Sequence, residues 1–210
     1  MKNIIKILKV LEKTQGKTML ATFNKLPHFQ ILIATILSAR SKDEVTEVIS
    51  RKLFKVYPTA KKLSKADPKD VKKIIKPIGF YNNKTKMIIN ASKQIVNEFG
   101  GVVPDKMDEL LKISGVGRKV ANCVLVYAHG ISAIPVDTHV HRISNRLGLV
   151  KTKIPDKTEI ELEKIVPKKY WLILNDVFVM HGKTICKPIG PMCSDCPIEK
   201  CCRFEDKRFK

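Results

Sequence analysis

The chain has 210 residues, and its 40 lysines and arginines exceed its 20 acidic residues by enough to give a formal charge of +20 at neutral pH. Hydrophobic residues make up 44% of the sequence, which excludes a disordered tail and a collagen-like polymer. The length suits one large domain or two small ones with a buried core. The longest apolar run, 120–136, contains polar residues and is too short to span a membrane.

The first 13 residues intersperse lysines among apolar residues. This pattern predicts an amphipathic helix rather than a secretory signal. We therefore expect an intracellular protein of the cytoplasm or nucleoid with no membrane association.

Positive charge is concentrated in one part of the chain. The segment 51–93 contains 13 lysines and arginines but only two acidic residues, Asp67 and Asp70. One-sided basic patches are typical of phosphate binding, because each neutralised phosphate releases condensed counterions. Nucleic acid is the partner that this charge favours, with a membrane surface or an acidic protein as alternatives.

Apolar residues recur at helical spacing along most of the chain. Helix signals mark several ends: Asp67 and Pro68 start one helix, whereas Gly100, Gly101 and Gly130 follow the ends of others. The predicted helices, in chain order, lie near 4–11, 43–53, 68–75, 87–99, 104–113, 118–129, 137–148, from 155 onward and 171–180. A short segment, 131–136, is strand-like. The sequence predicts an all-α fold of short helices with a cysteine-rich C-terminal segment.

Five of the six cysteines fall within the last 25 residues. Disulfides conflict with an intracellular location, so clustered thiolates point to a soft metal centre. Six, two and five residues separate the four best-spaced cysteines, which together span a 17-residue loop: Cys186, Cys193, Cys196 and Cys202. One compact loop fits a [4Fe–4S] cluster better than zinc, which usually takes two separated pairs. Cys201 competes with Cys202 for the last ligand position.

A glycine-containing turn lies between two predicted short helices at Gly115, Val116 and Gly117, and Arg118 and Lys119 follow it directly. Glycines let the backbone approach a phosphate, and the amides at the start of the next helix point outward. The arrangement predicts a helix-hairpin-helix, which grips the DNA backbone without reading its sequence.

Asp137 lies at the predicted start of the helix after the strand-like segment. The helix 119–129 would be about 16 Å long at roughly 1.5 Å per residue, and the seven residues 130–136 could reach back about 23 Å at ~3.3 Å each. Asp137 could therefore return to the end where Lys119 begins. An ordinary surface lysine and an ordinary helix cap are the alternative interpretation.

This lysine and this aspartate suit covalent chemistry on deoxyribose. Arg118, a helix N-terminus and the basic chain all disfavour protonated Lys119, so its pKa should be lowered and a neutral amine favoured. Asp137 could stabilise positive charge at C1′ as a base departs, or relay a proton.

The hairpin with its lysine, the downstream Val136-Asp137-Thr138-His139 and the four-cysteine loop together resemble the endonuclease III family of DNA glycosylases, within the helix-hairpin-helix superfamily. The resemblance covers nearly the whole chain, including 32–39 and 78–84. It implies two helical domains that flank a DNA-binding cleft. One would be a continuous six-helix barrel with the hairpin, 21–131, and the other would be a discontinuous domain, 1–20 plus 132–210, that carries the cluster loop.

The resemblance also implies a bifunctional glycosylase and AP lyase of base excision repair. It would act as a monomer on double-stranded DNA with damaged or abasic sites. Oxidised pyrimidines would be flipped out, Lys119 would attack C1′, and a Schiff base would permit β-elimination 3′ to the lesion. The resemblance maps the family aspartate onto Asp137 and the cluster ligands onto the four cysteines named above.

Some positions depart from the family pattern. Ser114 stands where proline is common, which should slightly loosen the entry to the hairpin. Arg40 stands where glutamine is frequent, and it could fill the gap left by the flipped base, opposite Phe80 as an apolar wedge. The alternatives are a surface phosphate contact for Arg40 and a core position for Phe80. His139 matches the family motif as a DNA-binding residue or as a structural hydrogen-bonding partner.

Two other functions compete with this interpretation. One is a monofunctional relative, such as a mismatch-specific thymine or uracil glycosylase or an adenine-removing enzyme. These relatives generally lack the lysine, so Lys119 favours the lyase. The other is a non-catalytic DNA-binding protein with a structural metal module.

Overall fold

The computed structural model describes residues 2–16, 18–23 and 25–208. These residues form helices and loops and contain no strand, which confirms the all-α prediction. No helix within these ranges is long and apolar enough to cross a membrane. The α-helices are α1 Lys2–Thr14, α2 Met19–Thr22, α3 His28–Ser38, α4 Asp43–Val56, α5 Ala60–Ser64, α6 Pro68–Ile75, α7 Tyr81–Glu98, α8 Met107–Leu110, α9 Arg118–Tyr127, α10 Thr138–Arg146, α11 Pro155–Ile165 and α12 Trp171–Thr184. Three short 3₁₀ turns are η1 Lys168–Tyr170, η2 Cys193–Asp195 and η3 Glu199–Cys201.

The chain folds into two compact units. One unit is a single segment, Met19–Ile131, and the other combines Met1–Thr18 with Ser132–Lys210. We call them the one-segment unit and the two-segment unit. The first contains α2 to α9, and the second contains α1 and α10 to α12 together with the cysteine-rich loop.

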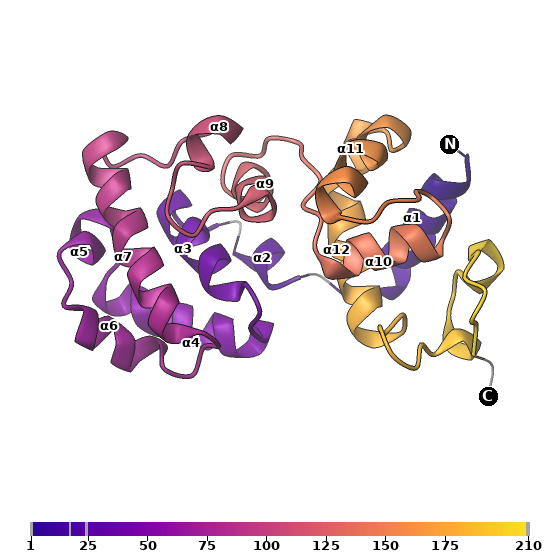
Figure 1. Ribbon diagram of the computed structural model, residues 1–210, viewed down its shortest axis with the longest axis horizontal. Coiled ribbons are helices and arrows are strands. Elements are labelled where there is room, and N and C mark those ends of the chain that lie inside the picture. Colours follow the sequence, from indigo (N-terminus) through magenta and orange to yellow (C-terminus); the bar gives the residue numbers. More distant parts are fainter. Residues whose placement is uncertain (1, 17, 24, 209–210) are drawn as a thin grey trace. The chain divides into compact units, whose positions relative to one another are not determined.

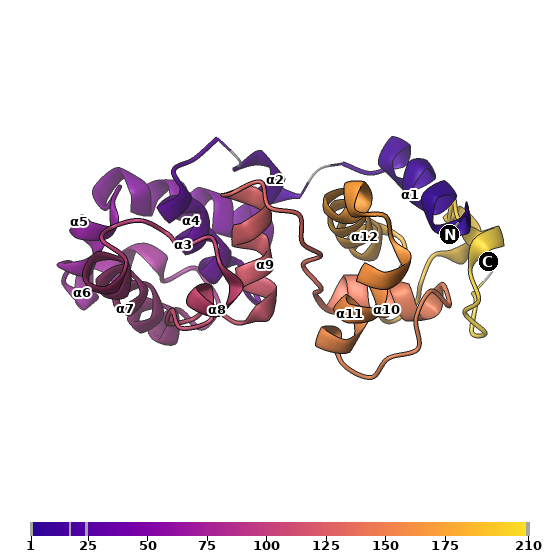
Figure 2. The same ribbon diagram turned by 90° about the horizontal axis from the view of Figure 1, so that it is seen from above.

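In the one-segment unit, α3 is the central helix. It contacts α4, α7 and α9, while α5 and α6 pack on α7 (Figure 1, Figure 2). Every residue of α3 from Ile31 to Leu37 is buried. A helix that is apolar on all sides lies inside a core, which explains why α3 has no amphipathic stripe in the sequence.

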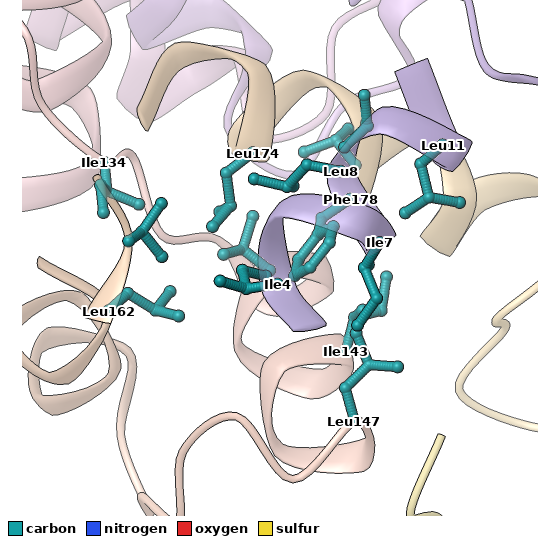
Figure 3. Close-up of a cluster of buried hydrophobic side chains, with 14 of the residues drawn as sticks. Ile4, Ile7, Leu8, Leu11, Ile134, Ile143, Leu147, Leu162, Leu174 and Phe178 are labelled. Carbon is teal, nitrogen blue, oxygen red and sulfur yellow. The ribbon is translucent and has the colours of Figure 1, made fainter. Parts of the chain in front are cut away.

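The core of the two-segment unit joins the two ends of the chain. Figure 3 shows Phe178 of α12 beside Ile4, Ile7 and Leu8 of α1. All four side chains are at most 3% exposed, and complete burial of a side chain of this size stabilises a fold by about 1.5–3 kcal/mol. The predicted N-terminal amphipathic helix therefore provides one side of the core of the unit that holds the cysteines.

The strand-like expectation for 131–136 is wrong, because this segment forms neither a strand nor a helix. Its apolar residues are explained by burial instead. Ile134 and Val136 belong to the core of the two-segment unit. The side-chain amide of Asn175 donates a 2.7 Å hydrogen bond to the Pro135 carbonyl and so fixes the backbone that leads to Asp137.

Candidate functional site

The predicted hairpin joins α8 to α9 in the one-segment unit. Gly115 has a φ of +80°, and a Cβ added to it would lie 3.0 Å from the Cβ of Met87 and 3.2 Å from Ile36. Both the backbone conformation and the close packing therefore require glycine at this position. Val116 is buried and its amide donates to the Ile113 carbonyl, which closes the turn.

Gln94 of α7 fixes the entry to this hairpin. Its Nε2 donates to the Lys112 carbonyl at 3.0 Å, and its Oε1 accepts from the Ser114 amide at 2.8 Å. A proline at position 114 could not donate the second hydrogen bond, because proline has no amide hydrogen. The Ser114 amide is therefore held by a hydrogen bond at the position where the absence of proline was expected to loosen the entry to the hairpin.

Helix α9 begins immediately after the hairpin. Its N-cap is Gly117, which offers no capping side chain, and no acidic residue lies in its first turn. Arg118 and Lys119 are its first two residues, and both are half-buried. A helix N-terminus presents amide hydrogens and partial positive charge to anions. The hairpin therefore combines a phosphate-binding geometry with a lysine in the first turn of the following helix.

Asp137 is the N-cap of α10 in the two-segment unit. Its Oδ1 accepts hydrogen bonds from the amides of His139 at 2.8 Å and Val140 at 2.9 Å. The capping role considered from the sequence is therefore real, and the second carboxylate oxygen takes no part in it. Lys119 and Asp137 belong to different units, and their joint action stays a prediction.

His139 packs inside the two-segment unit. Its Nδ1 lies 3.1 Å from Nη2 of Arg142, and a Cβ on Gly182 would come within 2.5 Å of the same nitrogen. Burial lowers the pKa of His139, and the Arg142 and Lys183 charges lower it further against the opposing effect of Asp137. A neutral ring that accepts from Arg142 has a structural contact here, and its predicted role in DNA binding stays a prediction.

Arg40 and Phe80 lie side by side in the one-segment unit. The Arg40 guanidinium carbon is 5.7 Å from the centre of the Phe80 ring, and Phe80 is 60% exposed. Both residues have left-handed backbones, with φ values of +54° and +59°, a conformation that costs a residue with a Cβ about 1–2 kcal/mol. Their exposure excludes the core position considered for Phe80.

Lys84, which no motif in the sequence marks, is only 4% exposed. Its Nζ donates to the carbonyls of Leu37 at 2.8 Å and Ala39 at 2.5 Å, and to the Ser41 hydroxyl at 2.9 Å. Burial lowers the pKa of Lys84 to about 8. A lysine is seldom buried, and nothing in its local sequence distinguishes it from the neighbouring exposed lysines.

One pocket of the two-segment unit is lined by the four best-spaced cysteines, Cys186, Cys193, Cys196 and Cys202. All are free thiols. Among the described residues, Cys201 does not line this pocket; it lines a groove beside α1 with Lys6 and Ile7, and Cys193 and Cys196 line both.

Ionisation of the cysteine thiols in this pocket is unfavourable. Burial raises the pKa of Cys196 to about 11 and raises that of Cys202, and the neighbouring cysteine thiolates raise both further. The neutral thiol is therefore the favoured form of both groups, and ionised thiolates here would need a cation beside them. Within the described ranges, no three histidine, cysteine or carboxylate side chains are arranged so that they could hold one metal ion.

Two arginines of α10 tie the cysteine loop to the helix that begins at Asp137. Arg142 donates to the Cys186 carbonyl at 2.7 Å. Arg146 donates to the Lys187 carbonyl at 2.7 Å and lies 4.2 Å from the centre of the Phe204 ring. Neither arginine was predicted as a site residue, although their spacing of four residues places them on one face of a helix.

Comparisons with known proteins agree with this arrangement. Residues 33–168 match the HhH-GPD superfamily of base excision DNA repair proteins. Endonuclease III of Thermotoga maritima is 48% identical over 182 residues, which cover 87% of this chain and 85% of that protein. A trapped endonuclease III–DNA covalent intermediate has a TM-score of 0.82 at 34% identity, with 94% of each chain covered. A thermostable thymine-DNA glycosylase has the same TM-score at 25% identity and covers 96% of this chain and 94% of its own.

More than half of the sequence lies inside the superfamily match, and the identity to a bacterial endonuclease III extends over most of both chains. The helical fold and the hairpin that leads into Lys119 are consistent with both comparisons. The chain therefore belongs to the endonuclease III family of HhH-GPD base excision DNA repair proteins.

Proposed function

We propose that the protein is a bifunctional DNA glycosylase and AP lyase that removes oxidised pyrimidines from double-stranded DNA. The observation that carries the proposal is the hairpin at the start of α9, where Lys119 follows Gly117 by two residues. A phosphate held by the hairpin amides would bring the sugar of a damaged nucleotide to this lysine.

In the proposed reaction, the neutral amine of Lys119 attacks C1′ of the deoxyribose. The bond from C1′ to the base breaks, and the base leaves with the bonding electrons and gains a proton. The amine then loses a proton, the sugar ring opens, and a Schiff base forms between Lys119 and C1′. Loss of a C2′ proton expels the 3′ phosphate oxygen by β-elimination, and water releases the enzyme by hydrolysing the Schiff base.

Asp137 would stabilise the positive charge that develops at C1′ while the base departs. A carboxylate in a fixed orientation does this without reorganising during the reaction. The cap to His139 and Val140 fixes Asp137 through Oδ1.

We further propose that Cys186, Cys193, Cys196 and Cys202 hold a [4Fe–4S] cluster. The support is that these four thiols line one pocket and that Cys201 does not line it. When bound, the cluster would cross-link the C-terminal loop, which has little core of its own.

The lesion specificity is tested by borohydride trapping on a panel of duplexes that carry an oxidised pyrimidine, a mismatched thymine, a mismatched uracil or an abasic site. We expect covalent adducts with oxidised pyrimidine and abasic duplexes. Base removal from the mismatches alone, with no adduct on any duplex, would favour the monofunctional alternative and contradict the proposal.

A further inference from the structure

The turn that carries Arg40 lies directly after α3. A C-terminal helix end leaves carbonyls without partners inside the helix, and the residue that follows is usually a glycine in the left-handed conformation. Here that residue is Arg40, which adopts the same conformation with a φ of +54°. The carbonyls of Leu37 and Ala39 must therefore find donors elsewhere.

Lys84 supplies them from α7. Its ammonium donates to Leu37 and Ala39 on one side of Arg40 and to the Ser41 hydroxyl on the other. A cation at the C-terminal end of a helix also interacts favourably with the helix dipole. The residues on both sides of Arg40 are thus fixed by one buried side chain.

The same lysine is connected to Phe80 through the backbone. The amide of Lys84 donates a 3.0 Å hydrogen bond to the Phe80 carbonyl, in the first turn of α7. Phe80 has the second left-handed backbone of a non-glycine residue among the described residues. The side chain of Lys84 therefore holds the backbone on both sides of Arg40, whereas its contact with Phe80 is a backbone hydrogen bond that any residue other than proline would make at this position.

We propose that Lys84 is a positioning residue for base excision: it holds Arg40 against Phe80, so that the two form a preformed pair that enters the duplex where the damaged nucleotide leaves. This inference rests on the proposed glycosylase function. A left-handed backbone at a bulky residue persists only where the surroundings impose it, and the two exposed side chains meet at 5.7 Å. An apolar side chain inserted between bases and a cation above the orphan base would compensate for lost stacking.

Gly79 provides a second way to disturb the same turn. A Cβ at position 79 would lie 3.1 Å from the Arg40 carbonyl oxygen and 3.5 Å from the Ser41 hydroxyl. A valine there would push on the turn from outside without removing the Lys84 ammonium.

The test compares Lys84→Met with wild type on two duplexes. In the first, an oxidised pyrimidine faces a normal base, and base removal is measured in a single turnover. In the second, an abasic site faces an abasic analogue, so that no orphan base has to be displaced, and borohydride trapping is measured. We expect about a ten-fold or greater loss on the first duplex and less than about a three-fold loss on the second.

A fluorescent adenine analogue opposite the lesion gives an independent signal. Binding of wild type should unstack this base and raise its fluorescence, and Lys84→Met should give a smaller rise at saturating protein. Lys164→Met is the matched control, because Lys164 is an exposed lysine of the other unit whose ammonium pairs with Glu161 of the same helix.

Equal losses on the two duplexes, or no loss on either, would overturn the role of Lys84. If Lys84→Met does not fold, Gly79→Val takes its place with the same expected pattern, and wild-type rates on both duplexes would overturn the inference. Failure of the proposed function is distinguishable, because wild type itself would then form no trapped adduct.

Discussion

Gln94 Oε1 accepts a 2.8 Å hydrogen bond from the amide of Ser114 and so connects the longest helix of the one-segment unit to the hairpin. The same side chain donates to the Lys112 carbonyl. A single glutamine therefore fixes the backbone just before Gly115, where the chain turns toward the amides that we propose bind phosphate.

Gln94→Ala removes both hydrogen bonds and should destabilise the fold by about 1–2 kcal/mol. A hairpin that samples other conformations should bind undamaged duplex about ten-fold more weakly. Urea unfolding and duplex titration at fixed salt measure the two effects. Gln30→Ala is the control, since the Gln30 side chain donates a 3.1 Å hydrogen bond to the Pro58 carbonyl elsewhere in the same unit. Equal weakening by both variants would contradict a specific role of Gln94.

Asp137→Asn removes the negative charge of this side chain but keeps an oxygen that can cap α10. Asparagine caps a helix about as well as aspartate, so the melting temperature should change little. Base removal should fall about 10²-fold or more, because the charge that stabilises the developing cation is gone. Asp67→Asn is the matched control, since Asp67 caps α6 through the Lys69 amide at 2.7 Å. Near-normal excision by Asp137→Asn would remove this carboxylate from the mechanism.

The cysteine pocket predicts different outcomes for two adjacent thiols. Cys202→Ser should lose iron, sulfide and the broad visible absorbance of the protein, because Cys202 lines the pocket. Cys201→Ser should keep all three, because Cys201 faces the α1 groove. Metal analysis and absorbance of the purified variants decide the point. A colourless wild type with one bound zinc would contradict the cluster. Loss of iron from Cys201→Ser but not from Cys202→Ser would show that Cys201, and not Cys202, is the fourth ligand.

Lys84 should make the free energy of unfolding depend on pH in the alkaline range. Its folded pKa of about 8 lies below the ordinary value of 10.5, so the unfolded chain binds more protons between these values. The cost of burying the charge is fully present below about pH 8 and is relieved as the pH rises toward 10.5. Within this window wild type should gain up to ~1.4 kcal/mol of stability per pH unit relative to Lys84→Met. Urea unfolding of both proteins from pH 7 to 10.5 measures the difference, and parallel curves would contradict it.

Local signals in the sequence predicted much of this molecule. Asp67 and Pro68 start α6, and Asp137 caps α10, because a cap is a contact between a side chain and amides two or three residues away. The hairpin at Gly115 could also be predicted, because the turn needs a positive φ at one position and the sequence has a glycine there. Each of these features depends on a few consecutive residues.

Features that depend on contacts between residues far apart in the sequence could not be predicted. Helix α3 is buried on all sides, so it shows no 3.6-residue pattern. The segment 131–136 alternates like a strand, yet Ile134 and Val136 are apolar because they pack into a helical core. Lys84 and Arg142 look like surface residues in the sequence, and their roles arise from carbonyls more than 35 residues away in the chain.

The central claim is that the Lys119 amine forms the covalent bond to C1′. Borohydride trapping on an abasic duplex, followed by protease digestion and mass spectrometry, identifies the modified residue directly. We predict that the adduct lies on Lys119, that Lys119→Gln still binds the duplex but forms no adduct, and that the Lys164→Gln control is trapped like wild type. An adduct on any other residue, or undiminished trapping by Lys119→Gln, would contradict the account.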